Sequence, residues 1–169
     1  MRIKDVIRAE KADVTYGGWH TGQMPKSLFP LGKSGKHSLN FRGGYDWQAV
    51  RFGALAAEFR VVVAVNFAKC EYYAHLGKIV GSDTQMLVSY EYHATHGGWH
   101  VHAGCGDIDL IPVGRYKGPW KRSIPKNWAD CRQTEWGVAT KEAAISKACK
   151  AFGIPEPPLD EAEKQMQLL

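Results

Sequence analysis

The sequence lacks any long hydrophobic run and holds few cysteines. The longest uninterrupted apolar stretch, Val61 to Val65, is far too short to cross a bilayer, so we expect no membrane span. The four cysteines (Cys70, Cys105, Cys131 and Cys149) form no C-x-x-C pair and fit no zinc-finger spacing, which favours reduced thiols. The first twelve residues are charged and do not resemble a secretory signal. Together these absences predict a cytoplasmic protein.

A nucleotide-binding phosphate loop is also missing. Residues 32–38, GKSGKHS, look like such a loop at first sight, but the spacing Gly-x4-Gly-Lys-Ser/Thr is not met. They belong to a Gly-, Pro-, Ser- and Lys-rich stretch, 15–44, without clean periodicity. We expect this stretch to be a long basic loop.

What the sequence does contain is enough apolar material for one globular domain. It has 169 residues, 44% of them hydrophobic, and a net charge of +5. This size suits one domain, which we place at 1–154, followed by a polar C-terminal tail at 155–169. The basic balance, with a sequence pI near 9.0, favours an acidic partner such as nucleic acid.

The hydrophobic patterning predicts an α+β fold. Helical spacing of apolar residues occurs in three segments, 2–12, 45–59 and 139–152. Runs rich in β-branched and aromatic residues, separated by turn residues, predict strands at 60–68, 71–80, 85–93 and 99–105, with a further strand at 108–113. The expected architecture is an antiparallel sheet of four or five strands with two or three helices packed on it.

The densest chemical signal is a run of histidines around a glycine pair. Because side chains alternate along a strand, His100 and His102 project from the same face. The Gly97-Gly98 pair predicts a hairpin, which brings His93 or Glu91 of the preceding strand beside them. Neighbouring imidazoles with a third ligand are typical of a divalent metal site, for which Mn, Mg or Zn are the candidates. A solvated or hydrogen-bonded histidine face is the alternative interpretation.

This arrangement resembles the HUH endonuclease superfamily, which includes rolling-circle replication initiators and conjugative relaxases. The triplet His100-Val101-His102 is similar to the motif of that superfamily. His93, seven residues before His100, takes the place of the third histidine of the relaxase type, and Glu91 takes roughly that of the acidic ligand of the initiator type. The resemblance implies an antiparallel sheet, a divalent metal and cleavage of single-stranded nucleic acid.

The resemblance also implies a tyrosine nucleophile. Initiators carry it on a helix after the histidine strand, but the expected helix at 139–152 has no tyrosine. Relaxases carry it near the N-terminus, where Tyr16 is available. Tyr16 is therefore the candidate catalytic residue; the alternatives are a metal-activated water, or binding without cleavage.

A basic and aromatic stretch follows the histidines. In residues 115–132 cations interleave with rings, so phosphates can be neutralised while bases stack. The alternative is a surface loop whose tryptophans pack inward. The candidate nucleic-acid-binding residues are Arg115, Lys117, Trp120, Lys121, Arg122, Lys126 and Trp128.

Two other function classes compete. A cupin-like metal site acting on a small molecule is suggested by His100, His102 and Asp107, although no histidine follows His102 to complete it. A non-catalytic, basic nucleic-acid-binding or accessory protein is the other class. Convergence of the histidines in space separates a metal site from a solvated face.

The basic segment generates a test of nucleic-acid binding. Substitution of Trp120 by Ala should weaken binding of a single-stranded oligonucleotide by about 1–3 kcal/mol, because a stacked ring is lost. The affinity of the unsubstituted protein should fall steeply as salt rises, since phosphate contacts release counterions. Fluorescence anisotropy at several salt concentrations measures both effects. Absence of binding at low salt would contradict the assignment.

Overall fold

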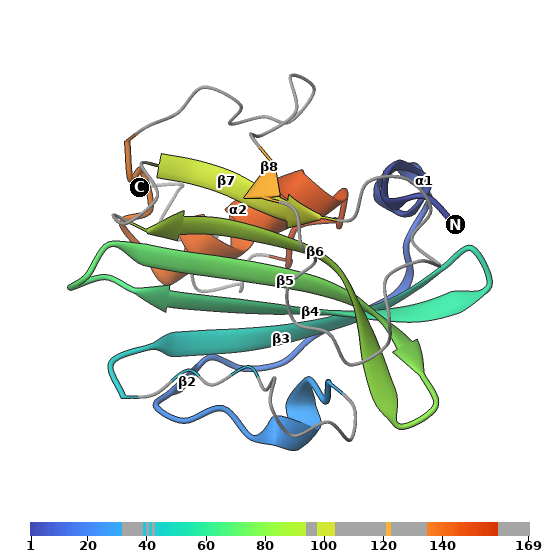
Figure 1. Cartoon of the computed structure of the whole chain (residues 1–169), viewed down its shortest axis with the longest axis horizontal. Helices are drawn as coiled ribbons and strands as arrows, with labels where there is room; N and C mark the ends of the chain where they lie inside the picture. The colour runs from blue at the N-terminus through green and yellow to red at the C-terminus, as the bar shows by residue number, and fades with distance from the viewer. Residues whose placement is uncertain are drawn as a thin grey trace.

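An antiparallel β-sheet dominates the molecule (Figure 1). The computed structural model describes residues 1–31, 39, 41, 43–93, 98–103, 121–122 and 135–158. Within them the sheet has the order β1-β3-β4-β5-β6-β7-β8, with β2 paired to β3, and every pairing is antiparallel. The strands are β1 (Ala12–Tyr16), β2 (His20–Thr21), β3 (Asp46–Ala54), β4 (Ala57–Asn66), β5 (Glu71–Val80), β6 (Asp83–His93), β7 (Gly98–Ala103) and β8 (Lys121–Arg122).

Among the described residues, three short elements accompany the sheet. They are the helices α1 (Ile3–Arg8) and α2 (Lys141–Phe152), and a 3-10 turn, η1 (Lys26–Leu28). Helix α2 begins after Thr140, whose hydroxyl accepts a hydrogen bond from the Ala143 amide, and ends at Gly153 in the left-handed region. The expected α+β class, the antiparallel pairing and the last helix therefore agree with the structure. The strand expected at 71–80 is β5, and those at 85–93 and 99–105 fall on β6 and β7.

The helix expected at 45–59 is wrong, and so is the count of four or five strands. This segment forms β3, a two-residue turn and the start of β4. Both faces of these strands are largely buried, so apolar residues are nearly continuous and accidentally satisfy helical spacing. Leu55 and Ala56 make the turn with positive φ, a conformation without the glycine or asparagine that signals a hairpin. The strand expected at 108–113 lies outside the described residues.

The N-terminal expectations also need correction. Helix α1 ends at Arg8, and Ala12 already begins β1, so 2–12 is not one helix. The segment expected as a long loop, 15–44, contains the end of β1, β2 and η1. It also contributes a buried apolar set to the second core: Met24, Phe29, Leu31, Leu39 and Phe41.

The sheet buries a different core on each face. On one face α2 packs on β4 and β5, and Figure 1 shows it crossing behind β6 and β7. That core includes Val61, Tyr72 and Phe152. On the other face the described apolar residues between Met24 and Phe41 pack on Val62, Ala64 and Met86. Each strand therefore sends alternate side chains into two separate environments.

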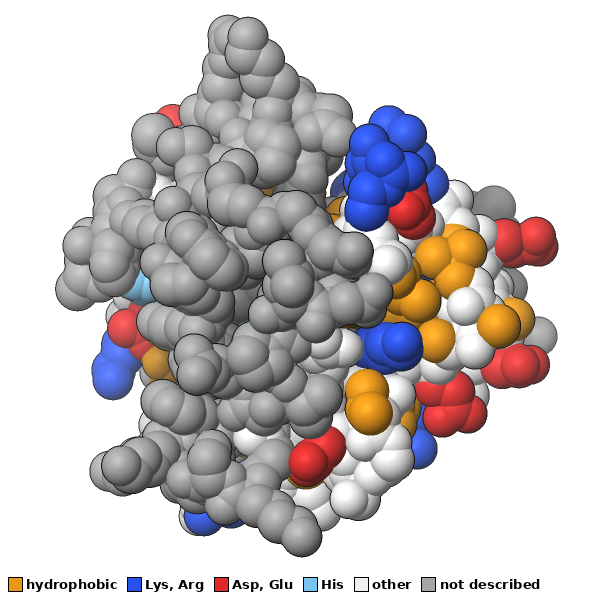
Figure 2. All heavy atoms as spheres, turned by 45° about the vertical axis from the view of Figure 1, so that its right-hand side comes forward, with side chains coloured by type: hydrophobic (Ala, Val, Ile, Leu, Met, Phe, Trp, Pro, Cys, Tyr) orange, Lys and Arg blue, Asp and Glu red, His pale blue; other side chains and the backbone are white. Residues whose placement is uncertain are grey.

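The side of the molecule that carries α1 shows mixed chemistry. Figure 2 shows basic, acidic and apolar side chains intermingled on its described part, rather than a field of one charge. A hollow of about 550 Å³ there is lined by Glu10–Ala12 and by Gly53–Glu58 around the β3–β4 turn. It lies at the β3–β4 turn, whereas His100 and His102 are level with Ala64 and Val62 in the other half of β4.

The closure of α2 over the sheet generates a stability prediction. Gly153 has φ of +63°, and a Cβ there would collide with the backbone carbonyl of Ile7 at the end of α1. Substitution of Gly153 by Ala should lower the free energy of unfolding by about 1–3 kcal/mol, because alanine is strained in the left-handed conformation and its Cβ would displace α1.

Gly81 supplies the matched control. Its φ is +59°, but nothing lies within 4 Å of a Cβ placed there. The Gly81→Ala variant should therefore lose only about 1 kcal/mol, the conformational part of the effect. Urea denaturation measures both variants, and equal losses would contradict the close packing of α1 on the end of α2.

Candidate metal centre

The β6–β7 hairpin sorts its side chains onto two faces. Glu91 pairs directly with His100, and Ser89 pairs with His102. The intervening residues Tyr90, Trp99 and Val101 enter the core shared with α2. Because alternation is strict, the carboxylate and the histidines share the opposite face.

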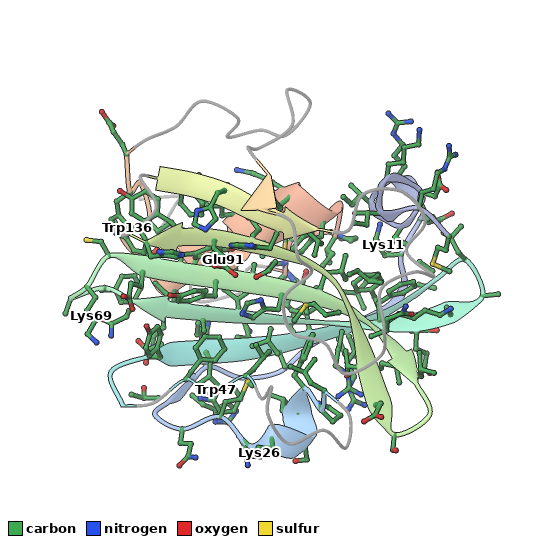
Figure 3. All side chains as sticks on the ribbon, in the orientation of Figure 1. Lys11, Lys26, Trp47, Lys69, Glu91 and Trp136 are labelled. Atoms are coloured by element: carbon green, nitrogen blue, oxygen red, sulfur yellow. The ribbon has the colours of Figure 1, made fainter. Side chains whose placement is uncertain are left out.

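The histidines converge on one carboxylate oxygen. The Nε2 atoms of His93, His100 and His102 lie 3.4, 3.6 and 3.7 Å from Oε2 of Glu91. Glu91, labelled on β6 in Figure 3, has no exposed side-chain surface, and the His102 side chain is 10% exposed. Ligand atoms of Glu91, His100 and His102 all lie within 4.8 Å of one another. These three residues are the candidate metal ligands of the structure; His93 contacts the same oxygen but is not part of this mutually close set.

The distances between the histidine Nε2 atoms and Oε2 of Glu91 suit a shared metal ion. Nitrogen and oxygen ligands about 2.0–2.1 Å from a tetrahedral ion are roughly 3.3 Å apart, close to the separations around Glu91 Oε2. The His100 tautomer also suits it: Nδ1 lies 2.9 Å from the carbonyl oxygen of Gly98, which can only accept, so Nδ1 carries the proton. In the neutral ring, Nε2 then presents its lone pair toward Glu91. The donor set and its tautomer thus fit a divalent cation.

Glu91 carries negative charge in this buried place. Burial raises its pKa, but the interaction with His100, the charge of His75, the Ser89 hydrogen bond and the charge of His102 together lower that pKa below its usual range. The carboxylate is therefore ionised at neutral pH. An ionised buried carboxylate requires compensating positive charge or hydrogen bonds, which a bound cation would add.

A second layer of polar residues supports the carboxylate from β5 and β6. Ser89 donates a hydrogen bond to Oε1 of Glu91, and its Oγ lies 2.7 Å from Nδ1 of His75. The Tyr73 ring stacks on His93 with centroids 6.0 Å apart, and burial and the charges of Glu71 and Glu91 raise the pKa of Tyr73 to about 12. The sequence did not single out His75 or Ser89 as site residues, because both lie on expected strands whose register to each other has no local signal.

The structure does not bring Tyr16 to this cluster. Tyr16 pairs with Val50 on β3 and shares the face on which α2 packs, whereas the histidines share the other face. Its hydroxyl donates to the carbonyl of Pro155 and lies 3.4 Å from Sγ of Cys149. Burial and the Cys149 contact raise the pKa of Tyr16, which makes its phenol a weak nucleophile. Tyr16 thus contacts the residues that follow α2, and it does not face Glu91.

Only a part of the predicted nucleic-acid-binding set can be placed. Lys121 and Arg122 form β8, which pairs with His102 and Val101 of β7. Lys121 and Arg122 therefore pair with the strand that carries two of the candidate ligands. Five further residues of the set lie outside the described part of the chain: Arg115, Lys117, Trp120, Lys126 and Trp128.

Comparison of the chain with protein-family models, curated proteins and solved structures finds no match. In the part of the chain that the structure describes, neither helix has the length and apolar character that crossing a membrane requires. Cys70 and Cys149 are free thiols, as expected for those two positions.

The position of Tyr16 predicts a structural effect on substitution. Tyr16→Phe should lower the free energy of unfolding by about 1 kcal/mol, because the hydroxyl contacts with Pro155 and Cys149 are lost. Metal binding should be unchanged, since the side chain lies on the opposite face of the sheet from Glu91. Chemical denaturation and metal titration measure the two effects. Loss of metal binding in a variant that unfolds like the original protein would contradict this assignment.

Proposed function

We propose that this chain binds one divalent transition-metal ion at Glu91, His100 and His102 and uses it to hydrolyse phosphodiester bonds in single-stranded nucleic acid. The observation that carries the proposal is the approach of His100 and His102 to the buried Glu91 carboxylate. The resemblance of His100-Val101-His102 to the HUH motif, with an acidic residue on the adjacent strand, supports the same conclusion.

The donor set favours particular metals. Two imidazoles and one carboxylate suit Zn²⁺, Mn²⁺ and Fe²⁺, whereas Mg²⁺ and Ca²⁺ prefer oxygen ligands. Zinc and manganese are therefore the candidates ahead of magnesium. His93, whose Nε2 lies 3.4 Å from Glu91 Oε2, is placed to hold the carboxylate or to complete the coordination.

The chemistry follows from the donor set. An ion held by Glu91, His100 and His102 would supply Lewis-acid polarisation of a phosphate oxygen and activation of a water nucleophile, a role that Tyr16, on the other face, would not fill. Glu91 and the two histidines would hold the ion through three side chains and leave positions for water and substrate. His100 is oriented for this role by its Nδ1 hydrogen bond to Gly98.

The substrate class rests on charge and on connectivity. The chain has a net charge of +5, and its basic aromatic segment includes β8, which pairs with the ligand strand β7 at His102. A polyanion bound along β8 would lie beside the strand that carries His100 and His102. Phosphate contacts and stacking on rings are the ordinary basis for binding single strands without strict sequence preference.

A structural metal site is the second candidate function. The burial of Glu91 and His100 favours it, because structural sites are closed whereas catalytic sites keep an open position. In that case the ion would fasten β6 to β7 and contribute to folding. Loss of stability without any catalytic effect on removal of the metal distinguishes this candidate from the first.

Metal analysis tests the proposal. Protein purified without a histidine tag and exposed to Zn²⁺ or Mn²⁺ should retain about one equivalent of metal. The double variant His100→Ala/His102→Ala, and separately Glu91→Gln, should lose it, because the ligands are removed. His20→Ala is the control, since His20 is exposed and stacks on Trp47 of β3.

Activity is read on a labelled single-stranded oligonucleotide with and without the metal. Cleavage should require the metal and survive Tyr16→Phe. Failure of the original protein to take up either ion at micromolar concentration would refute the metal centre. Uptake with higher thermal stability and no cleavage would refute the hydrolase and leave the structural site.

A further inference from the structure

We infer that Ser89 and His75 are positioning residues that decide which oxygen of Glu91 faces the metal, so that the carboxylate binds through Oε2 alone. This inference rests on the proposed metal site and specifies how it is built. Its basis is a continuous chain of contacts from His75 Nδ1 through Ser89 Oγ to Glu91 Oε1. Neither Ser89 nor His75 is exposed, so water does not compete for these contacts.

The protons in this chain have only one consistent arrangement. Ser89 donates a hydrogen bond from its Oγ to Oε1 of Glu91. A serine hydroxyl has only this one hydrogen to donate. Its oxygen must then accept from His75, which places the proton of that imidazole on Nδ1.

The two carboxylate oxygens of Glu91 therefore have different partners. Oε1 is occupied by the Ser89 hydrogen bond. Oε2 accepts no hydrogen bond from the residues that the structure describes, and it is the oxygen that the Nε2 atoms of His93, His100 and His102 approach. A monodentate ligand of fixed orientation results, since rotation of the carboxylate would break its bond to Ser89.

Packing fixes the position of His75, the residue of this series farthest from the metal. The His75 ring stacks on Phe41 with centroids 5.8 Å apart and on Tyr73 with centroids 5.9 Å apart. The second core, which includes Phe41, therefore prevents the imidazole from turning. A local register shift at Leu76/Gly77 sets His75 opposite Ser89, which lets the two side chains meet on one face. Polar partners behind a metal ligand of this kind fix its orientation and raise its affinity.

The experiment compares metal affinity and coordination in full-length variants. Ser89→Ala should weaken Zn²⁺ binding by about 10–100-fold in competition with a chelator, because Glu91 loses its fixed orientation. The Co²⁺-loaded variant should also show a changed visible absorption spectrum, which reports coordination number and geometry. A residue that served stability alone would change the unfolding midpoint without changing that spectrum.

His75 supplies a matched pair of variants. Asn and Leu are similar in size, but only the Asn amide can donate a hydrogen bond in the place of Nδ1. His75→Asn should therefore keep more Zn²⁺ affinity than His75→Leu. The control for loss of a buried hydroxyl is Thr84→Val, since Thr84 lies on the same strand and its Oγ1 makes no hydrogen bond with the described residues.

The outcomes separate this inference from the proposal beneath it. If the original protein binds Zn²⁺ while Ser89→Ala and His75→Leu bind it equally well with unchanged Co²⁺ spectra, the positioning role is refuted and the metal site stands. If the original protein binds neither ion, both are refuted. Should Ser89→Ala not fold, the His75 pair decides: lower affinity in the Leu variant alone supports the inference, and equal affinities overturn it.

Discussion

The pairing of Glu91 with His100 across β6 and β7 is the constraint on which the candidate centre depends. Directly opposed residues of an antiparallel pair send their side chains to the same face. One backbone register therefore brings together a carboxylate and an imidazole, and the two-residue period adds His93 and His102. A shift of one residue would move Glu91 into the α2 core and leave the histidines without it.

The buried carboxylate of Glu91 needs partners that compensate its negative charge. An isolated ionised carboxylate inside a protein is strongly unfavourable, and Glu91 has no exposed surface. Ser89 and the surrounding imidazoles compensate its charge, and a bound cation would do so more completely. Apolar residues could fill the same space without that requirement, so this polar cluster departs from the packing expected of an ordinary sheet interior.

One face of the sheet carries an apolar core, and the other carries the candidate metal ligands. Tyr72, Tyr90 and Trp99 form an aromatic group on the face covered by α2, and Tyr16 belongs to the same core. The opposite face combines the second apolar core with the histidines. Phe41 links the two, because it packs on His75 and belongs to the same apolar cluster as Met24 and Phe29, which also includes residues of β4 and β6. A segment that the sequence presents as a basic loop thus helps to hold the candidate site.

The sequence by itself determined what lies within a few residues. The alternation in His100-Val101-His102, the nearby glycine pair and the uninterrupted β-rich runs predicted the sheet, the hairpin and the four candidate ligands. The capped helix that begins after Thr140 was equally visible, because helix signals are local. Only the tertiary structure decided the rest. The face on which Tyr16 lies depends on its pairing with β3, more than thirty residues away, and the meeting of His75 with Ser89 depends on a register shift that no turn signal encodes. Periodicity tells which residues share a face of one strand, but hydrogen bonding between distant strands decides which faces meet.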